Sequence, residues 1–237
     1  MAGTGFLELA RELLFPSFCI LCRNPAEMGL PVCPDCLSRM EFISAKCGLC
    51  GEPFTGEVSE RLCRDCMTEK PHFDKARAWL KFQEPVIGII HSFKYQRQFQ
   101  FLDWMAQGLS QLFQTEFAGQ KFDMLIPVPL HWQRLMQRGY NQAFILARPM
   151  SRKLKIPLRP GALTRARNNP PQVGLTRPQR KENIKKVFAV KNPKMVSGKN
   201  ILLVDDVITT GATVDEAAKV LRKAGADSVS VLALARA

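Results

Sequence analysis

The sequence predicts an α/β fold, in which a parallel doubly wound sheet follows a small cysteine-rich segment. Two observations predict this organisation. Segments with a strand pattern alternate with segments of helical periodicity from residue 76 to residue 237, which is typical of a parallel sheet covered by helices on both faces. All 8 cysteines lie before this region, within residues 19–66. We therefore expect one unit over residues 1–75 and a second over residues 76–237.

The composition is that of a folded protein. The chain has 237 residues, of which 46% are hydrophobic and 23% are charged, so wholesale disorder is excluded. No apolar run approaches the roughly 18 residues that a membrane span needs. The N-terminus carries Glu8 and Glu12 and lacks the basic region of a secretory signal. It predicts an amphipathic helix at the start of a soluble, cytoplasmic protein without membrane insertion.

The positive charge is concentrated in one part of the chain. The formal net charge is +13, and residues 131–199 hold 17 lysines and arginines against a single acid, Glu182. A block of this kind indicates an anionic partner, which is phosphate, a phosphorylated metabolite or nucleic acid. The alternative is a solvated basic surface that aids solubility.

The cysteines predict two structural zinc sites. They form four Cys-x-x-Cys pairs, whose spacing places two thiolates on one turn, and two such pairs complete a four-cysteine zinc site. Four thiolates leave no open coordination position, so we expect structural and not catalytic metal. Sequential and interleaved pairing both remain open, and so does an iron–sulfur cluster. The ligands are Cys19, Cys22, Cys33, Cys36, Cys47, Cys50, Cys63 and Cys66.

Other uses of the cysteines are disfavoured. A disulfide framework is rare in the reducing cytosol, and a redox centre does not need four evenly spaced pairs. Residues 15–75 offer few periodic apolar positions. Metal binding would supply the missing folding free energy, on the order of 10 kcal/mol for each site. The first unit is therefore predicted to be an N-terminal helix followed by a double zinc ribbon.

Periodicity places the elements of the second unit in order. Residues 76–82 alternate as a strand, residues 85–93 and 99–113 have helical spacing, and residues 124–128 form a short buried strand. A helix over 142–154 is expected to be kinked or split at Pro149. Residues 201–204 are a fully apolar strand, 213–224 a helix closed by Gly225, and 229–234 a last strand.

The strongest motif is ILLVDDVITTGAT, residues 201–213. A buried strand runs into two acids, then into a turn rich in Thr and Gly, then into a helix. Such a turn directs backbone N–H groups and hydroxyls into one concavity at a helix N-terminus, which suits a phosphate. Acids beside a phosphate need an intervening group, such as sugar hydroxyls or magnesium.

This motif resembles the signature of the type I phosphoribosyltransferases, which use phosphoribosyl pyrophosphate (PRPP). The resemblance implies that Asp205 and Asp206 bind the ribose hydroxyls. It implies that the turn binds the 5′-phosphate through Thr209, Thr210, Gly211, Ala212 and Thr213. Family members that salvage 6-oxopurines carry an Asp at the place of Thr209, so hypoxanthine or guanine salvage is disfavoured.

Nearly the whole chain resembles the ComF/GntX family. The resemblance rests on the order of the paired cysteines, HSFKYQRQ, LIPVPLHWQRLMQRGYNQA, RARNNPPQVGLTRPQRKEN and VDDVITTGAT. It implies a sheet of the type I phosphoribosyltransferase kind after a double zinc ribbon, and a role in DNA uptake during natural transformation.

Further basic residues are candidates for the pyrophosphate of PRPP. Arg134 and Arg138 are one helical turn apart and suit a shared anion, although they could also face water. Lys94 is a further candidate for a phosphate contact. Residues 165–183 form a polar, basic stretch, and in the family fold a hood there closes over PRPP and excludes water. Its candidates are Arg165, Arg167 and Arg180.

Two functions follow from the sequence. The first is an enzyme that transfers the phosphoribosyl group of PRPP, with magnesium, to an acceptor and releases pyrophosphate. Positioning and electrostatics carry such a reaction. The alternative is a non-catalytic protein that responds to PRPP and binds single-stranded DNA or the DNA-uptake machinery.

Overall fold

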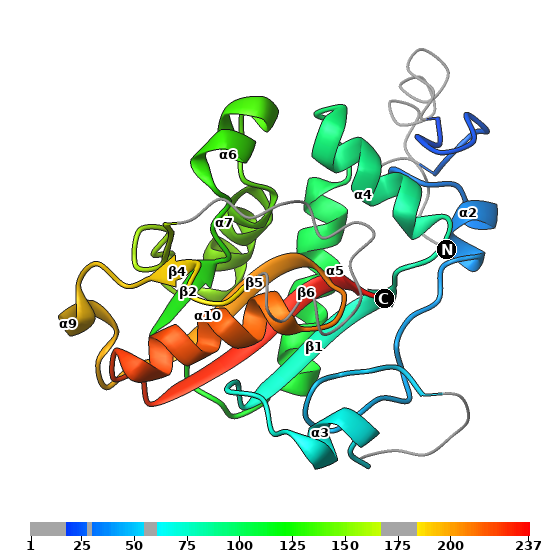
Figure 1. The fold of residues 1–237 in the computed structure, drawn as a ribbon. Coiled ribbons are helices and arrows are strands. Elements are labelled where there is room, and N and C mark those ends of the chain that lie inside the picture. Colours follow the sequence, from blue (N-terminus) through cyan, green and yellow to red (C-terminus); the bar gives the residue numbers. More distant parts are fainter. Residues whose placement is uncertain (1–17, 28–29, 55–60, 167–183) are drawn as a thin grey trace.

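A computed structural model describes residues 18–27, 30–54, 61–166 and 184–237. The amphipathic helix expected at the N-terminus lies outside these residues. Figure 1 shows a central sheet with helices on both sides and the cysteine-rich segment along one border. None of the helices in these ranges is long and apolar enough to cross a membrane.

The central sheet has four parallel strands in the order β1-β6-β5-β2. A two-stranded antiparallel ribbon, β3-β4, stands apart from it. The strands are β1 (Lys75–Lys81), β2 (Met124–Pro127), β3 (Thr164–Arg165), β4 (Phe188–Ala189), β5 (Asn200–Ile208) and β6 (Ser228–Arg236). The strands expected at 76–82, 124–128, 201–204 and 229–234 are all present. β5 is longer than expected, so the two acids lie within the strand and not after it.

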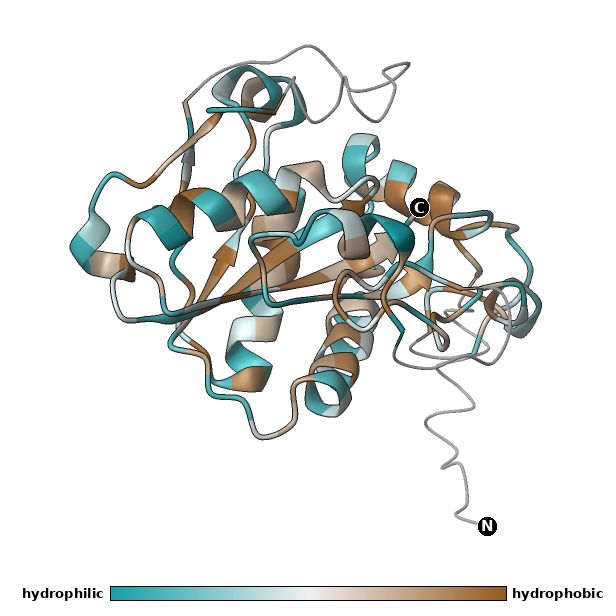
Figure 2. Ribbon diagram, turned by 60° about the horizontal axis from the view of Figure 1, so that its bottom comes forward, coloured by the Kyte–Doolittle hydropathy of each residue, from teal (hydrophilic) through white to brown (hydrophobic). Residues whose placement is uncertain are grey.

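The helices divide between the two faces of the sheet. The larger ones are α4 (Val86–Tyr95), α5 (Leu102–Glu116), α7 (Gln142–Leu154) and α10 (Ala212–Lys223). Alternate residues of β5 point to opposite faces. Leu202 and Val204 pack in a core with residues of α4, α5 and α7, which include Phe93, Met105 and Leu146. Ile201 and Leu203 share a core with α10. Figure 2 shows the hydrophobic strands at the centre of the molecule. This arrangement is the doubly wound sheet that the alternation predicts.

The smaller helices complete the fold. They are α2 (Pro34–Ser38), α3 (Arg64–Thr68), α6 (Trp132–Arg138) and α9 (Pro193–Val196). The expected split at Pro149 is wrong, because α7 runs through this proline as one helix. The end of α10 is as expected. Gly225 has a positive φ of 94°. Its N–H donates to Arg222 O at 3.0 Å, and the N–H of Ala226 donates to Leu221 O at 3.1 Å. These two hydrogen bonds form a Schellman motif.

The cysteine-rich segment packs on both cores. Cys19, Cys33 and Cys36 are buried with α4 and α5, while Cys47 and Cys50 are buried in the core of α10. The chain between them covers the free edge of β1. Ile43 N donates to Trp79 O at 3.2 Å, and Lys81 N donates to Glu41 O at 2.8 Å. The segment therefore closes an edge strand that would otherwise be open to pairing with other chains.

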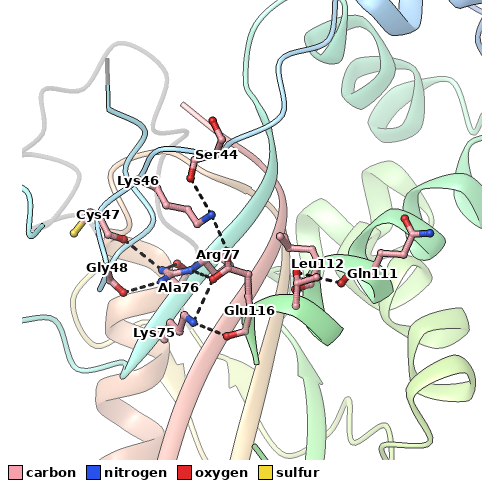
Figure 3. Close-up of polar contacts among 11 residues, drawn as sticks. Ser44, Lys46, Cys47, Gly48, Lys75, Ala76, Arg77, Gln111, Leu112 and Glu116 are labelled. Carbon is pink, nitrogen blue, oxygen red and sulfur yellow. Dashed lines mark hydrogen bonds and ion pairs between the residues drawn. The ribbon is translucent and has the colours of Figure 1, made fainter. Parts of the chain in front are cut away.

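A buried arginine fastens this segment to the sheet, as Figure 3 shows. Arg77 of β1 is 5% exposed. Its guanidinium donates to Gly48 O at 2.9 Å, to Cys47 O at 3.4 Å and to Glu116 Oε2 at 2.6 Å. Glu116, at the end of α5, also pairs with Lys46 at 2.7 Å. One ionic cluster therefore joins the cysteine-rich segment, β1 and α5.

Candidate active site and metal centres

Two adjacent carboxylates lie at the carboxyl end of β5. Asp205 and Asp206, the acid pair, are both partly buried. The N–H of Asp206 donates to Asp205 Oδ1 at 2.9 Å, and that of Val207 donates to Asp206 Oδ1 at 2.9 Å. Burial, together with the neighbouring charge of Asp206, raises the pKa of Asp205 well above its usual range. The free protein therefore holds a carboxyl group in a place that disfavours its ionised form.

Lys94 of α4 contacts the acid pair. Its Nζ lies 2.7 Å from Asp206 Oδ2, and both side chains are largely buried, with 20% and 13% of their surface exposed. The ammonium group therefore offsets part of the negative charge at the end of β5. Lys94 lies in the last turn of α4, the helix between β1 and α5. The end of α4 therefore holds this ammonium group beside the acid pair of β5.

The residues after β5 form an uncapped helix N-terminus. Residues 209–213, here called the phosphate loop, lead from β5 into α10. Gly211 is the N-cap residue with φ 78° and provides no side-chain cap, and a Cβ there would meet nothing within 4 Å. The positive φ, and not crowding, is what favours glycine. Thr210 Oγ1 accepts from the first N–H group of α10, Ala212 N, at 3.4 Å. At the remaining N–H groups of the first turn of α10, an anion is favoured by hydrogen bonding and by the helix dipole.

Three arginines bring positive charge to the same place. Arg134 and Arg138 of α6 and Arg165 of β3 line one pocket with the acid pair. Burial and the neighbouring Arg138 lower the pKa of Arg134. Burial, with repulsion from Arg134, lowers the pKa of Arg165 to about 10. Both guanidinium groups are therefore partly desolvated and lie close to another positive charge.

Local caps hold the arginines in position. Gly139 ends α6 in the left-handed conformation, and Asn141 then caps α7 while its Nδ2 donates to Val128 O at 3.0 Å. Arg138 donates to Gln142 Oε1 at 3.2 Å and to the Tyr95 hydroxyl at 3.1 Å. The turn between α6 and α7 is thus tied back to the end of β2.

The pocket has a volume of about 350 Å³, which is within the range of small-molecule sites. Two residues that line it each carry a buried donor with no hydrogen-bond partner among the described residues. The donors are Nε2 of Gln142, a residue that is 2% exposed, and Nε of Arg165. Buried donors without partners are costly. The pocket, with three arginines and a helix N-terminus on its lining, is suited to a ligand rich in oxygen acceptors.

The cysteines form two separate clusters of four. One holds Cys19, Cys22, Cys33 and Cys36, and the other Cys47, Cys50, Cys63 and Cys66, with the ligand atoms of each within 4.8 Å of one another. The Sγ atoms of Cys22 and Cys33 are 3.5 Å apart, and those of Cys50 and Cys63 are 3.6 Å apart. A tetrahedron with Zn–S bonds of about 2.3 Å has S–S edges of about 3.8 Å. The clusters therefore fit one zinc ion each, and the pairing is sequential.

Guanidinium groups approach a sulfur in each cluster. Nη2 of Arg39 donates to Cys36 Sγ at 3.2 Å, and Nη2 of Arg236 lies 3.7 Å from Cys50 Sγ. Four thiolates around a dication carry a net negative charge, which these arginines offset. His72, which could have replaced a cysteine, instead contacts Asp215 of α10 through Nδ1 at 3.2 Å.

Comparison with known proteins identifies the architecture. A phosphoribosyl transferase domain model matches residues 95–237, and a double zinc ribbon domain model matches residues 10–67. Competence protein F of Haemophilus influenzae is 34% identical over an alignment of 230 residues, which covers 92% of this chain and 96% of that protein. The chain belongs to the ComF family.

Other relatives have the same extent. The DNA utilization protein YhgH of Escherichia coli K12 is 33% identical and aligns over 94% of this chain and 99% of its own length. The competence protein ComFC of Bacillus subtilis is 30% identical over 86% of this chain and 84% of its own length. The expected resemblance to the ComF family is confirmed, as are the parallel sheet and the cysteine-rich ribbon before it.

The structure of this ComF-family chain brings most of the predicted site residues together. The acid pair, Lys94 and the arginines Arg134, Arg138 and Arg165 line the pocket with Thr209, Gly211 and Thr213. Thr210 and Ala212 instead line a neighbouring pocket. Arg167 and Arg180 lie outside the described residues. Sequence reasoning missed Gln142 and the capping role of Asn141, although Asn followed by a helical pattern is an N-cap signal. It also missed the pairing of Lys94 with Asp206.

Proposed function

We propose that this protein binds magnesium-PRPP in the pocket at the end of β5 and transfers the phosphoribosyl group to a nucleophilic acceptor. The single observation that carries this proposal is the meeting of three features in one pocket of about 350 Å³. These are the acid pair, an uncapped helix N-terminus and a group of basic side chains. PRPP has vicinal hydroxyls, a 5′-phosphate and a pyrophosphate, so each feature has a matching part of this ligand.

The roles follow from charge. The carboxylates of Asp205 and Asp206 accept hydrogen bonds from the ribose hydroxyls, and the phosphate loop binds the 5′-phosphate. Arg134, Arg138 and Arg165 hold the pyrophosphate. When the bond from C1 to pyrophosphate breaks, positive charge grows on the ribose and negative charge on the leaving oxygens. Groups already fixed at both ends stabilise this separation. Magnesium, which enters with PRPP, neutralises the diphosphate.

Arg167 and Arg180 belong to this proposal as hood residues that close over PRPP. Exclusion of water protects PRPP from hydrolysis. The relatives named for competence and DNA utilization support a cellular role in the use of incoming DNA. We propose that the protein has this role in addition to its reaction with PRPP, and that it acts in the cytoplasm.

The test is ligand-induced stabilisation. Magnesium-PRPP should raise the melting temperature, because a ligand that binds only the folded state stabilises it. Asp205→Asn and Asp206→Asn should remove this shift, whereas Asp227→Asn, at an exposed acid before β6, should keep it. A screen of acceptors for pyrophosphate release then tests catalysis. Absence of any shift and of any calorimetric heat in the wild type contradicts the proposal.

A second candidate function is binding of single-stranded DNA. It is favoured by α6, which has no buried residue and leaves Trp132 63% and Met136 77% exposed. The same helix carries Arg134 and Arg138 at the pocket. An exposed indole beside guanidinium groups can stack on a base while the cations contact phosphates.

Fluorescence anisotropy with labelled single-stranded DNA separates the two candidates. Affinity for DNA should fall steeply with salt, because phosphate contacts release counterions. Trp132→Ala should weaken it, and Asp206→Ala should leave it intact while abolishing PRPP binding. No binding at low salt would leave the PRPP function alone.

A further inference from the structure

The ion pair between Lys94 and Asp206 covers an oxygen of the acid pair. Asp206 Oδ1 accepts from the N–H of Val207 at 2.9 Å. Asp206 Oδ2 is buried, and Nζ of Lys94 lies 2.7 Å from it. A ligand hydroxyl that donates to Oδ2 must therefore displace the ammonium group. Lys94 and a ribose hydroxyl compete for the same carboxylate oxygen.

Lys94 is placed so that its charge can leave this oxygen and remain in the pocket. It lies in the last turn of α4, and 20% of its side chain is exposed. Its ammonium group is carried on a flexible stem of four carbons. Because Lys94 lines the same pocket as Arg134 and Arg138, a change of its rotamer brings the ammonium into the cavity that these arginines share.

Displacement of the ammonium is unfavourable unless another anion enters the pocket. On the described lining, the only acids are Asp205 and Asp206. Asp205 is a poor replacement partner, because burial and the charge of Asp206 raise its pKa and favour its protonated form. The three arginines of the pocket repel a further cation. A neutral hydroxyl by itself would therefore leave the displaced ammonium without a counter-charge, which is costly in a partly buried place.

A ligand that combines two groups removes this cost. It needs a hydroxyl that donates to the acid pair and, close to that hydroxyl, an anionic group that attracts the displaced ammonium. PRPP has both, because its diphosphate is attached to C1 beside the 2′-hydroxyl. Ribose 5-phosphate and nucleoside monophosphates carry the same hydroxyls and the same 5′-phosphate, but the group at C1 is neutral.

We propose that Lys94 is a specificity-determining residue, which selects ligands that carry an anionic group at C1 of the ribose. Its ammonium group blocks Asp206 until such a group draws it away. The released ammonium then contacts the diphosphate beside Arg134 and Arg138. Binding at the ribose position and at the diphosphate position is therefore coupled, and each ligand raises the affinity for the other by the same factor. This inference rests on the proposed function, because it assigns a role within the same pocket.

Calorimetry tests the coupling in the wild type, with ribose 5-phosphate and magnesium pyrophosphate as separate probes. Each probe should bind at least about fivefold more tightly when the other is saturating. This measurement needs no variant, so it does not depend on whether a substituted protein folds. Absence of coupling in the wild type would contradict the inference.

Lys94→Met removes the ammonium group and keeps an unbranched side chain. Ribose 5-phosphate should then bind at least about fivefold more tightly than to the wild type, because Asp206 is no longer blocked. Magnesium-PRPP should bind more weakly, because a charged contact with its diphosphate is lost. Lys199→Met is the matched control. It breaks the exposed pair with Asp123 at the amino end of β5 and should leave both affinities unchanged.

The opposite direction of the two changes is what a purely structural role of Lys94 would not produce. Weaker binding of both ligands to Lys94→Met would show that Lys94 only stabilises the site. Unchanged binding of ribose 5-phosphate would show that the ammonium does not block Asp206. Either result, with magnesium-PRPP binding to the wild type, would overturn this inference and leave the proposed function standing. Failure of the wild type to bind magnesium-PRPP would overturn both.

Discussion

At the scale of single residues, Asp205 shows a conflict between stability and binding. Burial and the adjacent Asp206 raise its pKa, so the folded state favours the protonated form more than the unfolded state does. The stability that the protonated Asp205 carboxyl contributes to the folded state is therefore fully present below the unfolded pKa, near 3.8. This contribution is lost as the pH rises through the raised pKa of the folded state. At neutral pH the carboxylate destabilises the free protein, and we interpret this as strain kept for a ligand.

Asp205→Asn should therefore raise the melting temperature of the free protein at pH 7 while abolishing stabilisation by magnesium-PRPP. The increase in melting temperature should grow as the pH rises from about 4, because only the wild type has a carboxyl group at position 205 that can ionise. Scanning calorimetry at several pH values measures it. Asp227→Asn, at an exposed acid, is the control and should change little. A variant that is less stable than the wild type at pH 7 would show that Asp205 is already compensated.

At the scale of elements, Glu116 joins α5, β1 and the cysteine-rich segment through Lys46, Lys75 and Arg77. Burial opposes ionisation, but the contacts with Lys46 and Arg77 prevail and lower the pKa of Glu116 to about 2. A lowered pKa means that the stabilisation is present above the unfolded value, near 4.5, and is lost as the pH falls toward 2.

Glu116→Gln should lower the free energy of unfolding by roughly 2 kcal/mol at pH 7, because it leaves the buried Arg77 without its counter-charge. Urea unfolding measures this loss, and the difference from the wild type should narrow as the pH falls below about 4.5. Glu41→Gln breaks the exposed pair with Lys81 and should cost much less stability than Glu116→Gln, because solvent screens an exposed ion pair. Equal losses of unfolding free energy in the two variants would show that burial of Arg77 does not add to the stability that its ion pair provides.

At the scale of the whole molecule, the double zinc ribbon packs in the cores on both faces of the sheet and is not merely attached to one end of it. Its first cluster shares a core with α4 and α5, and its second shares a core with α10. If the ribbon were attached only at one end, loss of a cysteine would disturb mainly the N-terminal segment. Shared cores instead predict that each loss spreads into one face of the phosphoribosyltransferase-type domain.

Cys33→Ser and Cys63→Ser should each reduce bound zinc from about two ions to one. Amide hydrogen exchange should then separate them, because Cys33→Ser should loosen α4 and α5, whereas Cys63→Ser should loosen α10. Elemental analysis checks the metal and mass spectrometry checks the exchange. Iron in place of zinc, or exchange confined to residues before β1 in both variants, would contradict this prediction.

The sequence alone determined the features that depend on local pattern. Alternation of strands and helices indicated the parallel sheet, and four Cys-x-x-Cys pairs indicated two metal sites. The strand, acids and turn of residues 201–213 indicated where the candidate site lies. Each of these features depends on contiguous residues, because a buried strand, a pair of cysteines on one turn and a helix N-terminus each consist of a few neighbouring positions.

Tertiary structure decided what depends on distant residues. The sequential pairing of the cysteines, the contact of Lys94 with Asp206 and the junction of Arg77 with Glu116 join segments that local patterns cannot relate. The passage of α7 through Pro149 shows tertiary packing prevailing over local preference. The neighbouring pocket that Arg236 lines exists only because the end of β6 meets the second cysteine cluster and the phosphate loop. Contacts of this kind depend on the sheet that brings the three segments together, and no local pattern encodes them.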